Sequence, residues 1–518
     1  MEIANWSPCT DVKNLLLLYK RLFSTPDQAL FTRSVKMSFS RFGKTNSLLL
    51  FNANPFFIQF GYFLVFSLLG YLALKVSKPR TASFRPYEDI DVFFTSVSAT
   101  TVSSMSTIEM EVFSNTQLVI MTVLMLVGGE VFTSLLGLQL AKFKMSKNRQ
   151  IDVEYEIKRL DGDSTLTYSS IGFLGYVVMG YLFVVHSVGS CLVALYIILA
   201  PSARKVLKNR GLYIPTFSVF TTVSTFSNCG FIPTNENMVA FKKNSGLLLL
   251  LIPQVLMGNT LYPPCLLFVI WVLKKASKRP EFGYILKNYR DMGYSHLLPF
   301  PRAARLAVTV LGFILIQFIL FCSMEWSSGA MDGLNSYQKL VGSLFQTVNS
   351  RHAGESVVDI SNISSAILVL YVVMMYLPPY TTFLPKKDDD QISEKVKESQ
   401  SRRKTLMENL MLSHLSYLVV FVILICITER HKMKQDSLNF NMLNITIEVI
   451  SAYGNVGFTT GYSCKRLQLL KPNSSCTDKG YGFAGRWSTE GKMILILVMF
   501  FGRLKKFSIK GGKAWKLS

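Results

Sequence analysis

The chain has 518 residues, of which 50% are hydrophobic and 17% are charged, and its formal net charge is +23. A soluble domain of this size would carry nearer 25% charged residues, and the apolar content excludes intrinsic disorder. A membrane protein with basic cytosolic loops accounts for both the apolar content and the basic excess.

Long apolar segments recur along the chain. Because about 20 apolar residues cross the hydrocarbon core of a bilayer, they predict eight membrane-spanning helices and an all-α integral membrane protein. The segments are 56–75, 117–141, 170–200, 247–273, 306–324, 363–384, 409–428 and 491–502.

A shorter segment of intermediate polarity lies between the two members of each pair of long segments. Each is too short to span the membrane and ends in Ser, Gly, Thr and Asn. Such backbone is tolerated at membrane depth only where protein buries it or where it lines a water-filled path. We therefore expect four helix–pore-loop–helix repeats around one central pore. The short segments are 89–103, 214–229, 338–353 and 441–456.

The distribution of Lys and Arg gives an orientation. Most of them fall on one side when the N-terminus and C-terminus are placed in the cytosol, as the positive-inside rule requires. Two basic stretches, 75–80 and 204–210, then face outside against the rule. The predicted divisions are a cytosolic N-terminal segment 1–56, repeat A 57–141, a cytosolic loop 142–163, repeat B 164–273, a cytosolic loop 274–305, repeat C 306–385, a charged cytosolic loop 386–408, repeat D 409–502 and a cytosolic C-terminus 503–518.

The breaks in the four short segments fall at equivalent positions, Ser104, Gly230, Gly354 and Gly457. A cation that enters a pore loses water, and inward-pointing backbone carbonyls can replace those oxygens. Glycine adopts the unusual dihedrals that this needs without steric cost. We predict a selectivity filter that binds Na⁺ at these four positions. The other predicted filter residues are Thr101, Val102, Ser103, Asn228, Cys229, His352, Ala353, Asn455 and Val456.

Repeat A differs from the other three because Ser104 replaces glycine. Its Cβ and hydroxyl constrain the backbone and intrude on the pore, so we expect a tighter ring that serves Na⁺ better than K⁺. The alternative is a serine that leaves selectivity unchanged.

The pore-loop motifs resemble those of a known family. TVSSMST (101–107), SNCGF (227–231), NSRHAGE (349–355) and GNVGFTTGYSC (454–464) resemble the pore loops of the plant HKT transporters, within the Trk/Ktr/HKT superfamily of K⁺ and Na⁺ transporters. The Ser-Gly-Gly-Gly filter is similar to that of the Na⁺-selective class I, whereas class II carries four glycines and also moves K⁺. SATTVSSMST with EMEVFSN, and FGRLKKF, resemble the cereal subgroup that retrieves Na⁺ from xylem sap.

This resemblance implies a function and its partners. The expected protein is a passive Na⁺ transporter of the plasma membrane that supports salt tolerance, with no cofactor besides the transported Na⁺. It also implies a homodimer with one pore per subunit, in contact with membrane lipid and not with nucleic acid. The alternative within the superfamily is a K⁺ or Na⁺/K⁺ transporter.

Arg503 follows Gly502 in the last apolar segment. A charge at membrane depth is costly unless it faces a cavity or a partner. By resemblance to the family, Arg503 faces the pore below the filter as a barrier to cations. The alternative is an arginine at the cytosolic end that extends toward the membrane surface.

Four carboxylates, Glu109, Glu111, Glu236 and Glu355, follow the first three filter breaks. On the extracellular side they could concentrate cations at the pore mouth. The alternative is that they cap helices or pair with Arg351.

The second long segments share a break that predicts either a constriction below the filter or close helix packing. His186 is expected to be a packing residue rather than a proton relay. Cys464 and Cys476 bracket an insert that we place outside, where oxidising conditions favour a disulfide between them. The breaks are VGGE (127–130), MGNTLYPP (257–264), YLPPY (376–380) and FFGR (500–503).

Two other classes of function fit less well. A secondary transporter for an organic solute predicts halves of opposite topology, whereas these four units share one orientation. A membrane enzyme needs clustered catalytic side chains, and the sequence has neither those nor a nucleotide-binding glycine loop. We therefore predict that the protein is not an enzyme.

Overall fold

The computed structural model describes residues 55–80, 88–155, 162–277, 279–381, 414–472 and 475–508, and every regular element in these ranges is a helix. The chain divides into two compact units at residue 58, and the elements below belong to the second unit except for the first four residues of α3. Most of the predicted N-terminal segment, the charged loop 386–408 and the end of the C-terminus lie outside the described residues.

Repeat A consists of α3 (Pro55–Val76), the short helix α4 (Asp89–Thr100) and a bent second helix made of α5 (Asn115–Gly128) and α6 (Glu130–Tyr155). A capping box satisfies the first amides of α5, because Ser114 and Gln117 each accept a hydrogen bond from the other's backbone N–H. Between α5 and α6 the direction changes by 55°.

Repeat B begins with α7 (Gly162–Leu199), followed by the amphipathic helix α8 (Pro201–Asn209) and the short helix α9 (Ile214–Ser227). Its second helix is also broken, into α10 (Ser245–Met257) and α11 (Tyr262–Ala276), which meet at 84°.

Repeat C consists of α13 (Phe300–Glu325), the short helix α14 (Ser336–Asn349) and α15 (Ser365–Tyr376). The described chain continues past α15 through the Pro378–Pro379 pair to residue 381. Both prolines lack a backbone N–H, so the helix cannot continue there with its hydrogen bonds intact.

Repeat D consists of α18 (His414–Thr428), the short helix α20 (Met442–Gly454) and α22 (Thr489–Ser508). The remaining helices connect these units. They are α12 (Pro280–Lys287), α19 (Arg430–Gln435), α21 (Cys464–Leu470) and the 3₁₀ turns η1 (Met110–Val112), η2 (Asn237–Phe241), η3 (Gly329–Met331), η4 (Ile360–Asn362) and η5 (Phe483–Arg486).

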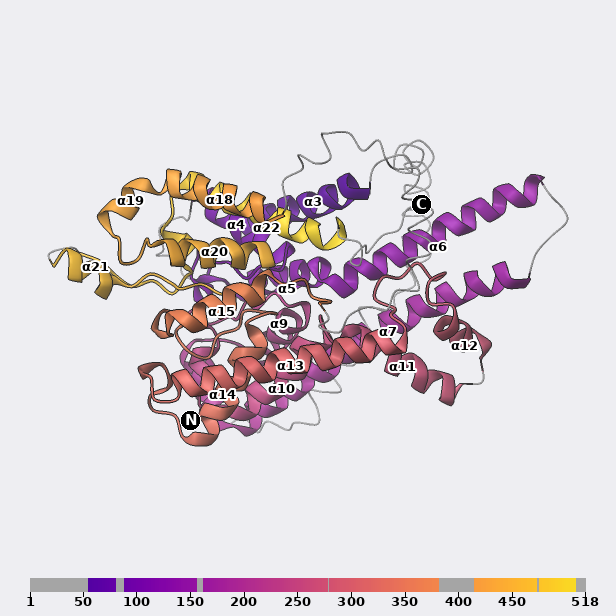
Figure 1. Ribbon diagram of the computed structural model, residues 1–518, viewed down its shortest axis with the longest axis horizontal. Coiled ribbons are helices and arrows are strands. Elements are labelled where there is room, and N and C mark those ends of the chain that lie inside the picture. The colour runs from indigo at the N-terminus through magenta and orange to yellow at the C-terminus, as the bar shows by residue number, and fades with distance from the viewer. Residues whose placement is uncertain are drawn as a thin grey trace, which may run out of the picture. The chain divides into compact units, whose positions relative to one another are not determined.

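The short helix of each repeat packs against the second helix of the repeat before it (Figure 1). Thus α9 contacts α5, α14 contacts α10, and α20 contacts α15. The short helix α4 of repeat A contacts α22 of repeat D, so the contacts form a closed cycle. The four repeats therefore surround one axis, as the sequence predicted.

A buried ion pair lies at the contact that closes this cycle. Lys492 Nζ on α22 lies 2.7 Å from Asp91 Oδ1 on α4, and the two residues are 401 positions apart. The side chains are only 7% and 12% exposed, so each charge depends on the other for its compensation.

All eight predicted apolar segments contain helix, and the four predicted short segments coincide with α4, α9, α14 and α20. By length and composition, three described helices are able to cross a membrane, or up to five if each bent pair counts as one span. That all eight segments cross remains a prediction.

The predicted cytosolic segment 142–163 is partly helical, since α6 continues to Tyr155 and α7 begins at Gly162, and its place in the cytosol stays a prediction. One local prediction was wrong. The predicted break at FFGR is absent, since α22 is continuous through Gly502. A single glycine inside a helix costs only about 1 kcal/mol relative to alanine, which is too little to interrupt an otherwise favourable apolar helix.

Candidate functional site

The four predicted filter positions share one backbone conformation. Their φ angles are 53° at Ser104, 89° at Gly230, 66° at Gly354 and 101° at Gly457, all in the left-handed region. A non-glycine residue takes this conformation at a cost of roughly 1–2 kcal/mol. The neighbouring loops must therefore hold Ser104 in a conformation that it does not prefer.

The four positions also touch one another in a ring. A Cβ built on each glycine would collide with an adjacent loop, so three of the positions have no room for a side chain. Ser104 Oγ lies 3.4 Å from the place of a Cβ on Gly230, which completes the ring. The closest distances from such Cβ positions are 1.6 Å from Gly230 to the Ala353 oxygen, 2.2 Å from Gly354 to the Val456 oxygen and 2.3 Å from Gly457 to the Ser104 Cβ.

Two asparagines end their short helices and tie the loops to the second helices. Asn228 and Asn455 are both left-handed, with φ of 58° and 51°. The Asn228 Nδ2 donates to the Val255 oxygen of α10 at 3.3 Å, and the Asn455 Nδ2 donates to the Met499 oxygen of α22 at 3.2 Å. Equivalent amides therefore fix equivalent loops in repeats B and D.

In repeat A, the equivalent position is Val102, which is also left-handed at φ 52°. Here the neighbouring hydroxyls supply the polar contacts, because Thr101 Oγ1 and Ser103 Oγ lie 2.8 Å apart. Asn455 of repeat D donates to the same Ser103 Oγ at 2.8 Å. The loops of repeats A and D are thus joined next to Ser104.

Repeat C is held differently, by His352. Its Nδ1 lies 2.6 Å from the Val348 oxygen, and its Nε2 lies 2.9 Å from Thr260 Oγ1 at the break between α10 and α11. This filter loop is therefore linked to the broken second helix of repeat B. All of the predicted filter residues, including Cys229 and Ala353, are buried.

Glycines of three second helices lie directly under the ends of the short helices. A Cβ on Gly128 would lie 2.0 Å from the oxygen of Thr100, and one on Gly258 would lie 1.8 Å from the oxygen of Phe226. A Cβ on Gly502 would lie 2.0 Å from the oxygen of Tyr453. Close packing explains each of these glycines, including Gly502, at which no break occurs.

Arg503 is enclosed by protein and is 1% exposed, so it does not extend toward the membrane surface. Its Nη2 donates to the Gly128 oxygen, where the second helix of repeat A begins to bend. Its guanidinium carbon lies 5.5 Å from the centre of the Phe63 ring. The positively charged guanidinium of Arg503 in repeat D therefore lies against the break in the second helix of repeat A.

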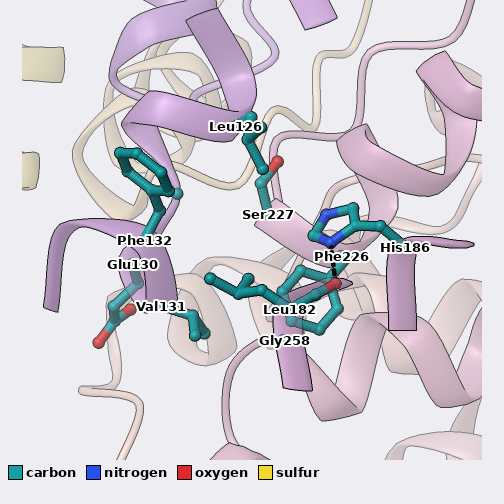
Figure 2. A pocket seen from close by; sticks show the side chains of 10 residues that line it. Leu126, Glu130, Val131, Phe132, Leu182, His186, Phe226, Ser227 and Gly258 are labelled. Carbon is teal, nitrogen blue, oxygen red and sulfur yellow. Dashed lines mark hydrogen bonds between the residues drawn. The ribbon is translucent and has the colours of Figure 1, made fainter. Parts of the chain in front are cut away.

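A partly open pocket of about 210 Å³ lies beside this break (Figure 2). His186 is a packing residue at its edge, since its Nδ1 lies 2.7 Å from the Leu182 oxygen and its ring packs edge-on against Phe226. The residues that line the pocket are Leu126, Gly129, Glu130, Val131, Phe132, Leu182, His186, Phe226, Ser227 and Gly258.

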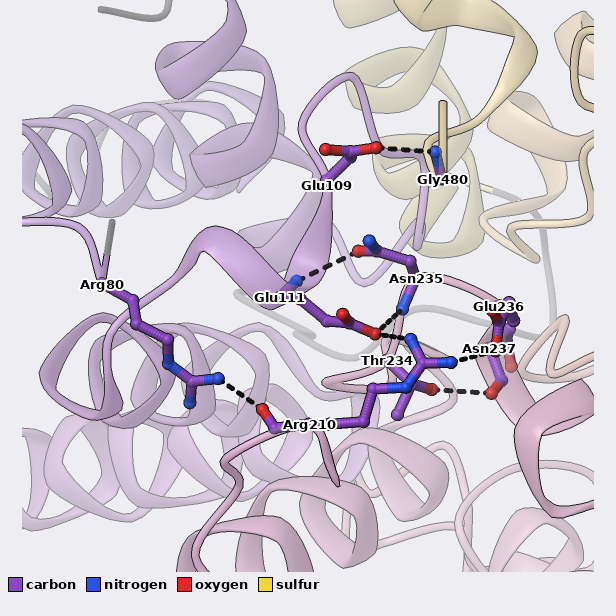
Figure 3. A network of polar contacts seen from close by, with 9 residues as sticks. All are labelled: Arg80, Glu109, Glu111, Arg210, Thr234, Asn235, Glu236, Asn237 and Gly480. Atoms are coloured by element: carbon purple, nitrogen blue, oxygen red, sulfur yellow. Dashed lines mark hydrogen bonds and ion pairs between the residues drawn. The ribbon is translucent and has the colours of Figure 1, made fainter. Parts of the chain in front are cut away.

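Two of the predicted mouth carboxylates are neutralised by an arginine (Figure 3). Arg210 forms ion pairs with Glu111 and with Glu236, the latter at 2.5 Å. Hydrogen bonds to Glu236 and Glu111 raise the pKa of the Arg210 guanidinium above its ordinary value. Arg80 donates to the Arg210 oxygen at 2.8 Å, so the two basic stretches that violated the positive-inside rule meet here.

The other two carboxylates have structural contacts. Glu109 accepts a hydrogen bond from the Gly480 N–H at 2.9 Å. Glu355 is fully buried and accepts one from Thr225 Oγ1 at 2.5 Å, which joins the loops of repeats B and C. The expected pairing of a carboxylate with Arg351 is absent from the described residues, since Arg351 donates to the Pro378 oxygen instead.

The insert between α20 and α22 covers the loops of repeats A and D. Cys464 and Cys476 form a disulfide at its start. Further along, the Gly482 N–H donates to the Ser106 oxygen at 3.0 Å, and the Ala484 N–H donates to Glu448 Oε1 at 3.1 Å. No residue pattern indicates these contacts in advance, because backbone amide donors are independent of residue type.

Comparison with known proteins gives consistent matches. The family model described as "TrkH: Cation transport protein" matches residues 53–510. The rice "Cation transporter HKT1;3" is 48% identical and covers 98% of this chain and 99% of its own length. The "Sodium transporter HKT1" of Arabidopsis thaliana is 53% identical, covering 86% of this chain and 92% of its own length.

One solved structure is also similar. It is the potassium transporter TrkH from Vibrio parahaemolyticus, with 14% sequence identity and a TM-score of 0.47. The match covers 87% of this chain and 83% of that chain.

Proposed function

The chain belongs to the TrkH family of cation transport proteins, and from this membership we propose that it is a Na⁺-selective passive transporter. It is a multi-pass membrane protein, and it is not an enzyme. In the proposed mechanism Na⁺ moves down its electrochemical gradient through the ring of Ser104, Gly230, Gly354 and Gly457.

The observation that carries the proposal is the place of Ser104 in the ring. Its side chain occupies space at the meeting point of three loops, with its Cβ 2.3 Å from where a Cβ of Gly457 would stand. A glycine at position 104 would leave this space open. The serine therefore narrows the passage on one side and adds a hydroxyl oxygen to the surrounding carbonyls.

This narrowing favours the smaller monovalent cation. A dehydrated cation needs ligand oxygens at a distance that matches its radius, or oxygens with enough field strength to replace its water. Na⁺ is smaller than K⁺ and gains more from a contracted ring. The ring is held in place by Asn228, Asn455 and His352, so it cannot simply widen around K⁺ without breaking these hydrogen bonds.

Below the ring, Arg503 forms the proposed barrier to cations. Its buried guanidinium lies against the Gly128 oxygen at the break of the second helix of repeat A. A positive charge there raises the energy of a passing cation. We assign to it the barrier below the filter that the family resemblance implies.

The cellular role follows from the same proposal. The similarity of this chain to the "Sodium transporter HKT1" of Arabidopsis thaliana supports the proposal that it is a plant Na⁺ transporter. We place this chain in the plasma membrane with both termini in the cytosol, as a homodimer with one pore per subunit. Retrieval of Na⁺ from xylem sap, and thereby salt tolerance, is the proposed physiological role.

The test is a two-electrode voltage-clamp recording from oocytes that express the chain. For a pore that conducts one monovalent cation, the reversal potential shifts by roughly 59 mV per tenfold change of that ion. We expect the potential to follow external Na⁺ and to ignore K⁺. A potential that follows K⁺ as well would favour the Na⁺/K⁺ alternative, and the absence of any cation current from surface-expressed protein would refute the proposal.

Two substitutions at one position separate the steric and the polar contribution of Ser104. Ser104→Gly removes both the Cβ and the hydroxyl, and we expect it to admit K⁺. Ser104→Ala is the matched control, because it keeps the Cβ and removes only the hydroxyl. Unchanged K⁺/Na⁺ permeability in Ser104→Gly would contradict the assignment of selectivity to this residue.

A further inference from the structure

Glu130 is a carboxylate in the middle of an apolar helix pair. It is the first residue of α6 and follows the break between α5 and α6 at Gly129. An ionisable side chain within a membrane-spanning segment is costly and marks a functional site unless a partner compensates it. Glu130 is half-buried, and among the described residues no hydrogen bond or ion pair engages its carboxylate.

The local backbone suits an acidic side chain at this position. Glu130 lies in the first turn of α6, where the backbone N–H groups have no partner within the helix. These groups and the helix dipole favour negatively charged groups near a helix N-terminus. The site therefore offers a carboxyl group that is not bonded to another side chain in the described part of the protein.

Several charged and polar side chains lie near Glu130. Arg503 donates to the oxygen of Gly128, two residues before Glu130, and its guanidinium lies within electrostatic range of the carboxylate. His296 and Tyr380 lie within range of the same charge. Tyr380 follows the Pro378–Pro379 pair of repeat C, so Glu130 lies where breaks of two repeats approach each other.

The orientation of the side chain agrees with this placement. Figure 2 shows the carboxyl group of Glu130 at the edge of the pocket, directed away from Ser227 and His186. The carboxylate is therefore not satisfied by the polar side chains of the pocket. It is directed out of the pocket instead.

We propose that Glu130 forms an inner cation subsite opposite Arg503, at which Na⁺ pauses after it leaves the filter. This inference rests on the proposed function and adds a specific conduction residue to it. The carboxylate attracts the cation, and the guanidinium opposes it, so the height of the inner barrier depends on both charges.

The first test removes one charge at a time. In inside-out patches with equal Na⁺ on both sides, Glu130→Gln should lower the inward Na⁺ conductance by at least about tenfold, as a unit charge a few ångströms away implies at an effective dielectric constant near 20. Arg503→Gln should raise it. The double variant should lie nearer to the wild type than either single variant does, because the two charges oppose each other.

A matched control lies on α12. Glu281 is a carboxylate on a different helix from Glu130, and it accepts a hydrogen bond from Ser169 Oγ at 3.5 Å. Glu281→Gln should conduct like the wild type. All conductances are normalised to the amount of protein at the surface, measured by biotinylation.

A second test restores the charge after the channel has assembled, so that a folding defect cannot explain the result. A Glu130→Cys channel should conduct poorly, should recover when a negatively charged methanethiosulfonate is applied from the cytosolic side, and should lose current with a positively charged one. The unsubstituted channel, which keeps its free cysteines, is exposed to the same reagents as the control.

The outcomes separate this inference from the proposed function. Wild-type conductance in Glu130→Gln, or equal responses of Glu130→Cys to both reagents, would overturn the subsite while the Na⁺ current of the wild type stands. A wild type without Na⁺ current would instead overturn the proposed function. Opposite responses to the two reagents would establish Glu130 on the conduction path.

Discussion

The ion pair between Asp91 and Lys492 allows a sharp test of how the ring is closed. Lys492→Met leaves the Asp91 carboxylate buried without its partner, since the two side chains are only 12% and 7% exposed. Removing one partner of a buried pair costs about 3–5 kcal/mol, because the remaining charge stays desolvated. Asp91→Leu should cost a similar amount for the same reason.

Removing both charges should be far less harmful. In Asp91→Leu with Lys492→Met, the desolvation penalty of both ions disappears together with their attraction, and such replacements are often neutral or stabilising. The loss of unfolding free energy in the double variant should therefore be well below the sum of the losses in the two single variants. The coupling between the two positions should be about 3 kcal/mol or more.

The assay is the apparent melting temperature of the detergent-solubilised protein, followed by fluorescence-detected gel filtration after heating. We expect each single variant to melt roughly 5 °C or more below the wild type. The control is Lys75→Met, which breaks the exposed ion pair with Asp89, whose side chains are 50% and 68% exposed; such pairs contribute at most about 1 kcal/mol. The reasoning would be refuted if the single variants at the buried pair melted like this control. It would also be refuted if the double variant lost as much thermal stability as the two single variants together.

Three further predictions concern packing, the insert and the pore mouth. Gly502→Ala places a Cβ 2.0 Å from a main-chain oxygen of α20 and should lower both thermal stability and transport, whereas Gly312→Ala, with open space around it, should melt at or above the wild-type temperature. Cys464→Ser removes a disulfide across 12 residues and should cost about 2–4 kcal/mol, an effect that reductant reproduces in the wild type and not in the variant. Arg210→Gln frees its two paired carboxylates and should increase inward Na⁺ current at low ionic strength, with the gain vanishing at high salt as screening shortens the range of the charges; a gain independent of salt would contradict this.

The repeated pattern of the sequence was sufficient to predict the short helices and the positions at which the backbone breaks after them. Each short segment combined an apolar stretch with a run of small polar residues, and the structure places α4, α9, α14 and α20 there. The left-handed conformation at Ser104 was also foreseeable, because three glycines at equivalent positions indicate what the backbone requires. The alignment of the four repeats therefore indicated the backbone conformation of Ser104, which the serine by itself does not indicate.

The contacts made by charged side chains were not predictable in the same way. Glu111 and Glu236 seemed equivalent to Glu355 in the sequence, yet Arg210 pairs with the first two and a threonine binds the third. Pairing depends on distances between loops that are far apart along the chain. The reason for a glycine at position 502 was hidden in a similar way. It is the close approach of α20, which no neighbouring residue in the sequence indicates.

The closed cycle of helix contacts has a consequence for biosynthesis. The contact of α4 with α22 joins the first and the last repeat, so the ribosome must complete nearly the whole chain before it can form. Until then the cycle of contacts between the repeats is not closed, and Asp91 lies in a largely apolar environment without Lys492 as its partner. Contacts between residues so distant in sequence form slowly. A chain that stops before α22 cannot form the contact that closes the cycle. The last described helix, α22, thus determines when the earlier repeats become a closed ring, and truncated products differ from the full chain in that Asp91 lacks Lys492 as its partner.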